Sequence, residues 1–480
     1  MELIIKNLGS IKNAKIALDK KFYVFVGYNN TGKTYLSQIL WSLFDQEVYT
    51  NFINNRKYEE LNLNNDNFIL EAAFLQKVLT DFSNYLTFTV IPSIFNISKD
   101  HFILKEAEIK FEYSFSEFEK REVEFSGGVI LSDKTNKDNS RVELYKTIKK
   151  SNSNIINLSI FDKEDNSKKL PDDIKSKVLN INEILLNTIL KTCFSFNNGF
   201  YLPASRLFYP VFYQYIYKVE KEKREEMSKK LLTILEQKDS SKFDIKSLTS
   251  FRSQYTKPMD ELFGKLYSLN KEDAVKDTYL QLINEIKLLL GGDIVIKKVE
   301  GVSPIEFQLD LGEDKQLDMY LTSSSINQLT TLLLYLKHWV SDTNNFLFVD
   351  EPEENLHPEN QEKLIHTLLK FAATNNNKVL ITTHSSLVTS VINNFLNIGY
   401  LKSKQDFNLN SFLTKHHVDF DVKNILEKKD FGIYFFSGSD VIEYSAKEYG
   451  VYFEDFDKIE KNIKNFSEFI TDEIYRYSEQ

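Results

Sequence analysis

Polar and apolar residues alternate over the first 26 residues in a pattern typical of short strands. Strands are predicted at 3–5 and 14–18, and a more continuous apolar run predicts a buried strand at 22–26. A glycine-containing loop follows directly. Residues 33–45 then predict a helix, because leucine and isoleucine recur there at helical spacing.

Strands and helices alternate again in the second half of the chain, after Gly291 and Gly292. This alternation is typical of an α/β sheet, and α/β is the fold class that the sequence predicts. The predicted strands are 294–298, 305–309, 317–321, 346–349 and 379–382, and the predicted helices are about 326–340 and 359–373.

The long middle of the chain has a different pattern. From 46 to 198, asparagine-rich polar segments surround short predicted strands, and a predicted helix follows at 174–190. A predominantly helical block occupies about 207–290. Opposite charges alternate within it at helical spacing over 218–226, which favours a solvated helix face over a binding patch. The middle has further predicted features: strands at 108–113 and 122–125, and a polar, mobile loop at 133–139.

Composition narrows the classes of function. The 480 residues carry a formal net charge of −9, which argues against a protein that coats nucleic acid, although the 60 lysines and arginines could still form a local basic groove. Cys193 is the only cysteine, so an intrachain disulfide is impossible and a reducing, cytoplasmic location is expected. No apolar run reaches the ~18 residues of a membrane-spanning helix, and no signal-peptide core is present.

The loop after the third predicted strand has the spacing Gly-x-x-x-x-Gly-Lys-Thr. Its glycines let backbone N–H groups surround a phosphate chain, Lys33 can reach the outer phosphates, and the Thr34 hydroxyl can bind Mg²⁺. An ordinary turn is the alternative, but the loop joins a buried strand to a helix, as phosphate binding requires. The predicted phosphate-binding residues are Gly27, Asn29, Asn30, Thr31, Gly32, Lys33 and Thr34.

Two acids follow the apolar run 346–349. A P-loop requires a carboxylate at the end of a neighbouring strand to hold the Mg²⁺ shell, and Asp350 is placed for this. Glu351 is placed to orient or deprotonate the attacking water as a general base. The alternative is an acidic turn between a strand and a loop.

Two further segments carry candidate chemistry. His384 follows the predicted strand 379–382 and could bond a γ-phosphate, whereas His357 is predicted to lie in a loop that could form a dimer contact. The serine-rich segment 322–325 precedes a helix. Ser325 and Gln328 could form a capping box there, and the same helix start could bind the phosphate of another subunit. Both readings of the segment are compatible.

Taken in chain order, these motifs resemble the ABC-type ATPases, in their SMC-like and OLD-like branch. The resemblance covers residues 1–46, 201–206 and 290–395, and includes 7–12, the P-loop, the serine-rich signature, 350–358 and 383–385. It implies ATP hydrolysis with Mg²⁺ in two composite sites of a head-to-tail pair. Each site would take Lys33, Thr34, Asp350, Glu351 and His384 from one copy, and Ser323, Ser324 and Ser325 from the other. Asn355 and His357 would then lie in the loop at the dimer interface.

The chain also departs from the family pattern. Ser325 stands where many relatives have glycine, which predicts slow or conditional hydrolysis. The usual Q-loop glutamine is missing, and Ser205 or Arg206 is the candidate for that corner. The Asp-x-Asp at 419–421 lacks the context of the OLD-family nuclease domain, so no nuclease activity is expected from this chain alone.

The organisation resembles ATPase subunits of bacterial antiphage systems of the Septu-like and PARIS-like kind. That resemblance implies a sensor whose ATP-dependent closure controls a separate nuclease or toxin, with a phage protein or nucleic acid as trigger. A DNA-repair or DNA-clamping SMC-like ATPase is the alternative, and a transporter subunit fits less well.

The expected divisions are a nucleotide-binding lobe at 1–46, a mixed α/β insertion at 47–199, a Q-loop-like segment at 200–206, a helical insertion at 207–290, the second nucleotide-binding part at 291–395 and a C-terminal tail at 396–480.

Overall fold

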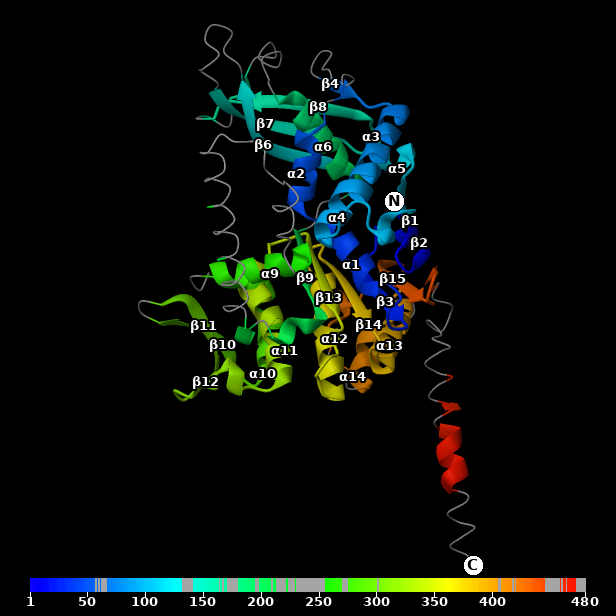
Figure 1. Cartoon of the computed structure of the whole chain (residues 1–480), viewed down its shortest axis with the longest axis vertical. Coiled ribbons are helices and arrows are strands. Elements are labelled where there is room, and N and C mark those ends of the chain that lie inside the picture. The colour runs from blue at the N-terminus through cyan, green and yellow to red at the C-terminus, as the bar shows by residue number, and fades with distance from the viewer. Residues whose placement is uncertain are drawn as a thin grey trace, which may run out of the picture.

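The fold is described from a computed structural model of the whole chain (Figure 1). The structure describes all residues except 57, 59–60, 62–66, 132–140, 164, 166–167, 171–179, 195–197, 209, 213–221, 223–228, 230–254, 270–274, 300–301, 405–406, 417, 419, 445–457, 459–460, 463 and 472–480. The predicted loop at 133–139 lies outside the described residues, as do most of the charged segment 218–226, the first part of the helix predicted at 174–190, and Asp419.

A six-stranded sheet forms the centre of the molecule, in the order β16-β15-β3-β14-β13-β9. All neighbours in it are parallel except β16, which pairs antiparallel with β15. Parallel strands of this kind are covered on both faces and read as continuous apolar runs. The strands are β3 (Phe22–Gly27), β9 (Asn198–Leu202), β13 (Asn345–Asp350), β14 (Lys378–Thr383), β15 (Phe431–Phe436) and β16 (Val441–Glu443).

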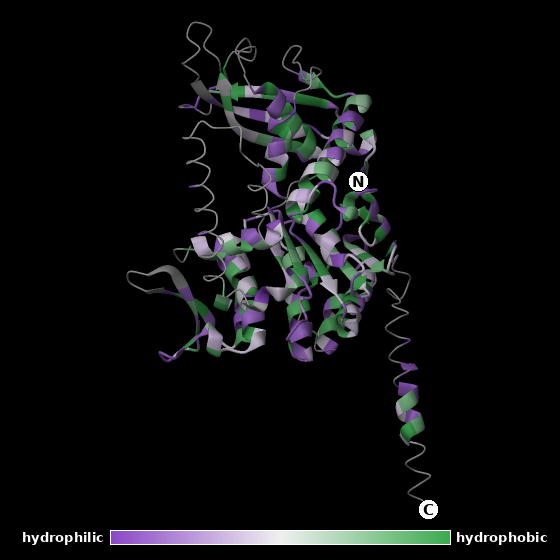
Figure 2. Cartoon of the chain, viewed as in Figure 1, coloured by the Kyte–Doolittle hydropathy of each residue, from purple (hydrophilic) through white to green (hydrophobic). Residues whose placement is uncertain are grey.

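Two apolar cores lie on opposite faces of this sheet, because successive side chains of a strand point to opposite sides. Phe22, Val24 and Val26 of β3 join one core, whereas Tyr23 and Phe25 join the other. Figure 2 shows the central strands as predominantly hydrophobic. The first core includes residues of α9 (Lys257–Ser268), α10 (Leu280–Leu290), α11 (Ser324–Leu334), α12 (Pro358–Ala373), α13 (Ser386–Lys402) and α14 (Leu409–Lys415), and the second includes residues of α1 (Lys33–Ser42).

A small antiparallel sheet lies beside the P-loop. It consists of β1 (Glu2–Leu8), β2 (Ile11–Ala17) and β5 (Glu108–Glu112), with β1 in the middle. The strand predicted at 108–113 therefore pairs with the N-terminal hairpin, although it lies within the expected insertion. The turn of the hairpin reaches the phosphate loop, since a Cβ atom on Gly32 would lie 2.9 Å from atoms of both Ser10 and Ile11.

The expected mixed insertion lies at the top of Figure 1, and its helices join the second core beside α1 and the central sheet. A second antiparallel sheet, in the order β4-β8-β7-β6, carries it. Its strands are β4 (Asn67–Ile69), β6 (Val123–Leu131), β7 (Arg141–Lys149) and β8 (Ile155–Phe161), and its helices are α2 (Gln46–Asn54), α3 (Ala72–Tyr85), α4 (Ile91–Ile94), α5 (Phe115–Lys120) and α6 (Ile181–Phe194).

A third antiparallel sheet precedes the signature helix and projects at the lower left of Figure 1. It consists of β10 (Asp293–Val299), β11 (Val302–Asp310) and β12 (Gln316–Asp318). The strand predicted at 317–321 is only partly correct, because residues 319–321 form a 3₁₀ turn. The helix predicted at 326–340 begins earlier, at Ser324, and its last turn, Tyr335–Trp339, is a π-helix.

Among the described residues, none of the helices combines the length and the apolar character needed to cross a membrane.

Candidate functional site

The phosphate loop joins β3 to α1 through two glycines with left-handed or extended positive φ values. Gly27 has φ 143°, and a Cβ atom there would lie 2.4 Å from the carbonyl oxygen of Phe436 in the neighbouring strand. Gly32, with φ 95°, occupies the N-cap position of α1. The Thr31 hydroxyl donates to the carbonyl oxygen of Tyr28 at 2.8 Å and closes the loop. The sequence therefore builds the loop as the predicted phosphate-binding turn at a helix N-terminus.

Lys33 lies inside this loop. Its Nζ atom donates to the carbonyl oxygens of Gly27 and Tyr28, at 3.0 and 2.6 Å. Burial lowers the pKa of Lys33 to about 8, even though the carboxylates of Glu351 and Asp350 act in the opposite direction. The ammonium is thus held where it can exchange two carbonyl contacts for the oxygens of a phosphate.

Asp350 ends β13 and is buried among hydroxyl groups. Its Oδ1 atom accepts from the Thr382 hydroxyl at 2.9 Å and from Ser37 at 3.4 Å, and its Oδ2 atom accepts from Tyr201. Burial raises the pKa of Asp350 despite these hydrogen bonds. Thr34 precedes Ser37 by one turn of α1, and its carbonyl oxygen accepts from the Ser37 hydroxyl at 3.0 Å.

This set of groups fits a magnesium ion. Mg²⁺ takes oxygen ligands and is held by one or two protein groups together with substrate phosphates and water. The hydroxyl of Thr34 and the carboxylate of Asp350, the two predicted ligands, supply this chemistry, and Ser37, Tyr201 and Thr382 orient the carboxylate. When bound, the ion would neutralise charge on the phosphates. The described residues contain no group of three or more His, Cys, Asp or Glu side chains that could hold a metal without the substrate.

Glu351 and His384 contact each other beside the loop. Nε2 of His384 lies 3.0 Å from Oε1 of Glu351, and this hydrogen bond holds the pKa of Glu351 below its ordinary value. Nδ1 of the same ring lies 3.0 Å from the carbonyl oxygen of Gly27. Both ring nitrogens therefore face oxygen acceptors. The arrangement keeps Glu351 ionised, as a general base requires.

The backbone at Glu351 is in a conformation that non-glycine residues rarely adopt. Its φ is 46°, within the left-handed region. The N–H group of Glu351 donates to the carbonyl oxygen of Thr382 at 3.0 Å, which ties it to β14. Strained backbone of this kind is found at functional sites and persists only where the surroundings hold it.

Arg206, one of the two candidates for the Q-loop corner, lies behind the acidic pair. It is 2% exposed, and burial lowers the pKa of its guanidinium to about 10. Nη1 donates to the carbonyl oxygens of Pro203 and Asp350, at 3.1 and 2.6 Å, and Nη2 donates to that of Glu351 at 3.2 Å. Arg206 thus supports the backbone of the acidic pair, and Tyr201 of the same segment contacts the Asp350 carboxylate.

Several supporting residues were missed by the sequence interpretation. Glu353 accepts from the Thr383 hydroxyl at 2.6 Å and from the backbone N–H of His384 at 3.1 Å, so it fixes the histidine against the loop that carries Glu351. Burial raises the pKa of Glu353. The role of Ser37 could have been predicted, because Ser37 follows Thr34 by one helical turn. Thr382 and Tyr201 become recognisable only once the strands are paired.

The serine-rich signature lies apart from this cluster. Ser323 is the N-cap of α11, where its Oγ atom accepts from the backbone N–H of Ile326 at 3.4 Å and lies 2.8 Å from Oγ of Ser325. The predicted capping box between Ser325 and Gln328 is wrong, because the helix begins two residues earlier than that box requires. Ser323 and Ser324 are exposed at the helix N-terminus.

The loop after Glu351 leads away from the cluster toward solvent. Asn355 is exposed and has φ 58°, and His357 is exposed and caps α12 by accepting from the backbone N–H of Glu359 at 3.4 Å. The structure thus gathers Lys33, Asp350, Glu351 and His384 at one site. The signature serines and His357 lie on surfaces around it.

Comparison with known proteins decides the family. A family model described as AAA ATPase domain matches residues 1–389. The chain belongs to the AAA ATPase domain family. The α/β P-loop fold that the sequence predicts is therefore confirmed, and the chain is an ATP-hydrolysing enzyme.

No curated protein matches this AAA ATPase chain at a significant level. Similar solved structures include the Smc head domain of Pyrococcus furiosus bound to the C-terminal domain of ScpA, with 12% identity, 98% of each chain covered and a TM-score of 0.33. The SMC head domain from Thermotoga maritima has 10% identity and a TM-score of 0.29, and the match covers 92% of this chain and 98% of that one.

The geometry assigns a task to each group of the AAA ATPase site. Lys33 is placed to supply positive charge to the phosphates, and the backbone N–H groups of the P-loop are placed to hold them. Glu351 is placed to accept the proton of an attacking water, and its depressed pKa would keep it ionised for that step. His384 holds Glu351 through Nε2 and is itself held by Gly27 and Glu353.

Proposed function

We propose that two copies of this chain close around ATP and form two composite sites, as in the ABC-type ATPases that the motifs resemble. Each site would use Lys33, Thr34, Asp350, Glu351 and His384 of one copy. Ser323, Ser324 and Ser325 of the other copy would complete it. The observation that carries this proposal is the exposed, serine-rich N-terminus of α11, which lies outside the hydrogen-bonded cluster of its own chain.

The chemistry of that helix start suits a phosphate. A helix N-terminus carries unpaired N–H groups and a partial positive charge, and serine hydroxyls add further donors. Two large apolar side chains just before it, Tyr320 and Leu321, are 68% and 62% exposed, and a second copy would cover them. Asn355 and His357 provide polar contacts on a neighbouring exposed loop.

We further propose that this closure is a regulatory signal, and that the chain is the sensor subunit of an antiphage complex with a separate nuclease or toxin. The insertion that carries β6 to β8 would bind the effector or the trigger. A partner can shift the balance between open and closed states only by the difference in its affinity for the two. Binding at the insertion would therefore have to be coupled to the ATP site through the structure between them.

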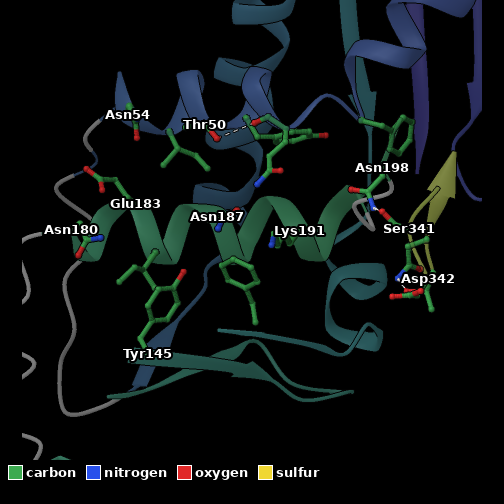
Figure 3. Close-up of a pocket in the computed structure, with 18 residues that line it drawn as sticks. Thr50, Asn54, Tyr145, Asn180, Glu183, Asn187, Lys191, Asn198, Ser341 and Asp342 are labelled. Atoms are coloured by element: carbon green, nitrogen blue, oxygen red, sulfur yellow. Dashed lines mark hydrogen bonds between the residues drawn. The ribbon is translucent and has the colours of Figure 1, made fainter. Parts of the chain in front are cut away.

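A cleft lies between the insertion and the opposite ends of the strands that carry the site. It has a volume of about 580 Å³ and lies between α2 and α6 of the insertion and the turn at 341–344 of the nucleotide-binding part (Figure 3). Asn198, at the start of β9, and Ser341 contribute to its wall and are joined by a hydrogen bond of 2.8 Å. The cleft is thus lined by the amino end of β9 and by the segment that leads into β13. Tyr201 and Asp350 lie toward the carboxyl ends of these two strands.

The proposal predicts that Glu351→Gln retains ATP, loses turnover and remains a dimer. Glutamine preserves the shape of the side chain but cannot accept the proton, so the closed state would persist. Light scattering of the variant with ATP and Mg²⁺ should give twice the monomer mass, and Lys33→Met, which removes the phosphate contact, should remain monomeric. Normal hydrolysis by Glu351→Gln would overturn the general-base assignment.

The same variant tests the regulatory role. A product of the neighbouring gene should co-purify with wild-type protein, and it should be released or activated in the ATP-trapped form. The purified chain alone should not cut DNA. Salt-sensitive DNA binding by the trapped dimer, without any effector, would instead favour the DNA-clamping alternative.

A further inference from the structure

One guanidinium holds both peptide units on either side of the catalytic carboxylate. Arg206 binds the carbonyl oxygens of Asp350 and Glu351, the two that flank the strained φ of Glu351. The N–H group between them is bound by Thr382. The backbone at Glu351 is therefore held by two contacts to Thr382 of β14 and by two from Arg206, while His384 holds the side chain.

The same guanidinium is held by the signature helix. Gln328 of α11 is fully buried, and the amide orientation that satisfies both partners places its Oε1 atom 3.1 and 2.7 Å from Nη1 and Nη2 of Arg206. α11 also packs directly against the 3₁₀ turn Ala204–Phe208 that contains Arg206. A continuous chain of contacts therefore leads from α11 through Gln328 and Arg206 to Glu351.

We propose that Arg206 is a positioning residue for Glu351, and that Gln328 makes this positioning depend on the signature helix. The proposal rests on the composite-site function proposed above. In a head-to-tail dimer, the ATP bound by one copy touches α11 of the other copy. ATP at one site would thereby set the general base of the second site, and the two sites would hydrolyse ATP cooperatively.

A movement of the start of α11 should be passed on to Arg206 and Glu351. Gln328 lies five residues after Ser323, or roughly 7.5 Å along the helix axis, so a displacement of the helix start reaches it almost undiminished. Arg206 is fully enclosed and cannot turn to water for replacement bonds. Glu351 sits in a conformation that the surroundings must hold, so loss of one of its holders allows it to relax.

Gln328→Met tests the proposal, because methionine keeps the length of the side chain and removes the acceptor. Gln308→Met is the matched control: Gln308 is also buried, on β11, and its Nε2 atom donates to Asp318 at 2.6 Å, away from the site. Loss of a hydrogen bond to a charged group predicts a kcat at least about tenfold lower for Gln328→Met. KM should change little, because the P-loop contacts remain.

Cooperativity separates positioning from simple stability. The Hill coefficient for ATP should approach 2 in the wild type and Gln308→Met, and fall to about 1 in Gln328→Met. Hydrogen exchange in the peptide 350–356 should be faster in Gln328→Met than in the control. If Gln328→Met matches the control in kcat, Hill coefficient and exchange, the proposal is wrong.

Two further outcomes are distinguishable. If the wild type does not dimerise, the composite-site function fails, and exchange at 350–356 still decides whether Gln328 supports Glu351 within one chain. If Gln328→Met does not fold, Arg206→Lys replaces it, since lysine keeps the charge but cannot bind both carbonyl oxygens and Gln328 together. Arg206→Lys should then show the lower kcat and the faster exchange, and wild-type values in both would overturn the proposal.

Discussion

Single residues at this site show properties that their types do not normally have. Burial lowers the pKa of Lys33, and the contact with His384 lowers that of Glu351. Glu351 also has a left-handed backbone conformation, and the guanidinium of Arg206 is buried. These perturbations concentrate where the phosphate loop meets the acidic strand. Such clustering is typical of a functional site, and it agrees with the family assignment.

The depressed pKa of Lys33 predicts a pH dependence of ATP binding. The free ammonium titrates near pH 8, and a bound phosphate raises its pKa, so binding takes up a proton above pH 8. The Kd for ATP should be flat below about pH 7.5 and should rise by up to about tenfold per pH unit above pH 8.5. Titration of a fluorescent ATP analogue from pH 6.5 to 9.5 measures this.

Lys33→Arg is the control for this titration, because a guanidinium stays protonated throughout the range. Whatever its absolute affinity, its pH profile should be flat. An equally flat profile for the wild type would show that Lys33 remains fully charged in the loop.

At the scale of elements, the sequence predicted the strands and helices that carry chemistry and missed how side chains from different elements combine. The P-loop, the acidic end of β13 and His384 were predicted because each follows a local pattern. Arg206 was only one of two candidates for its corner, because its role depends on the carbonyl oxygens of Asp350 and Glu351, which are 144 and 145 residues away. No periodicity in one segment reports such a contact.

The start of α11 shows the same limit in a different way. The serine-rich run offers several residues that could cap a helix, and the local pattern does not decide between them. The structure selects Ser323 because its Oγ atom reaches the N–H group of Ile326. Gln328, which was predicted to serve as the far end of a capping box, is instead buried against Arg206.

The cap makes a prediction about stability. Ser323→Ala should lower the free energy of unfolding by no more than about 1 kcal/mol, because the hydrogen bond of 3.4 Å is long. Ser324→Ala, one residue later and exposed, should leave it unchanged. Denaturant unfolding of both variants measures the difference. Equal losses in the two would show that Ser323 does not cap α11.

At the scale of the whole molecule, the central sheet supports the insertion at one end of its strands and the ATP site at the other. The cleft lies at the amino ends of β9 and β13, and Tyr201 and Asp350 lie at their carboxyl ends; β13 is buried along its whole length. These strands are a direct route from the insertion to the site. The route supports a regulatory role, while the family assignment alone shows ATP hydrolysis.

The central claim is that each ATP site contains residues of two copies, and mixing two inactive variants tests it most directly. Lys33→Met disables a P-loop, and Ser324→Arg places a bulky cation at an exposed signature position. Each variant alone should lack ATPase activity. Equal amounts mixed should regain activity well above either variant alone, with an upper limit of roughly a quarter of the wild-type rate, because half of the dimers are mixed and each has one intact site. The cooperativity inferred for Gln328 and Arg206 would lower the rate below that limit, because the second site of a mixed dimer holds no ATP. A mixture as inactive as its components, or a Ser324→Arg variant with full activity, would contradict the account.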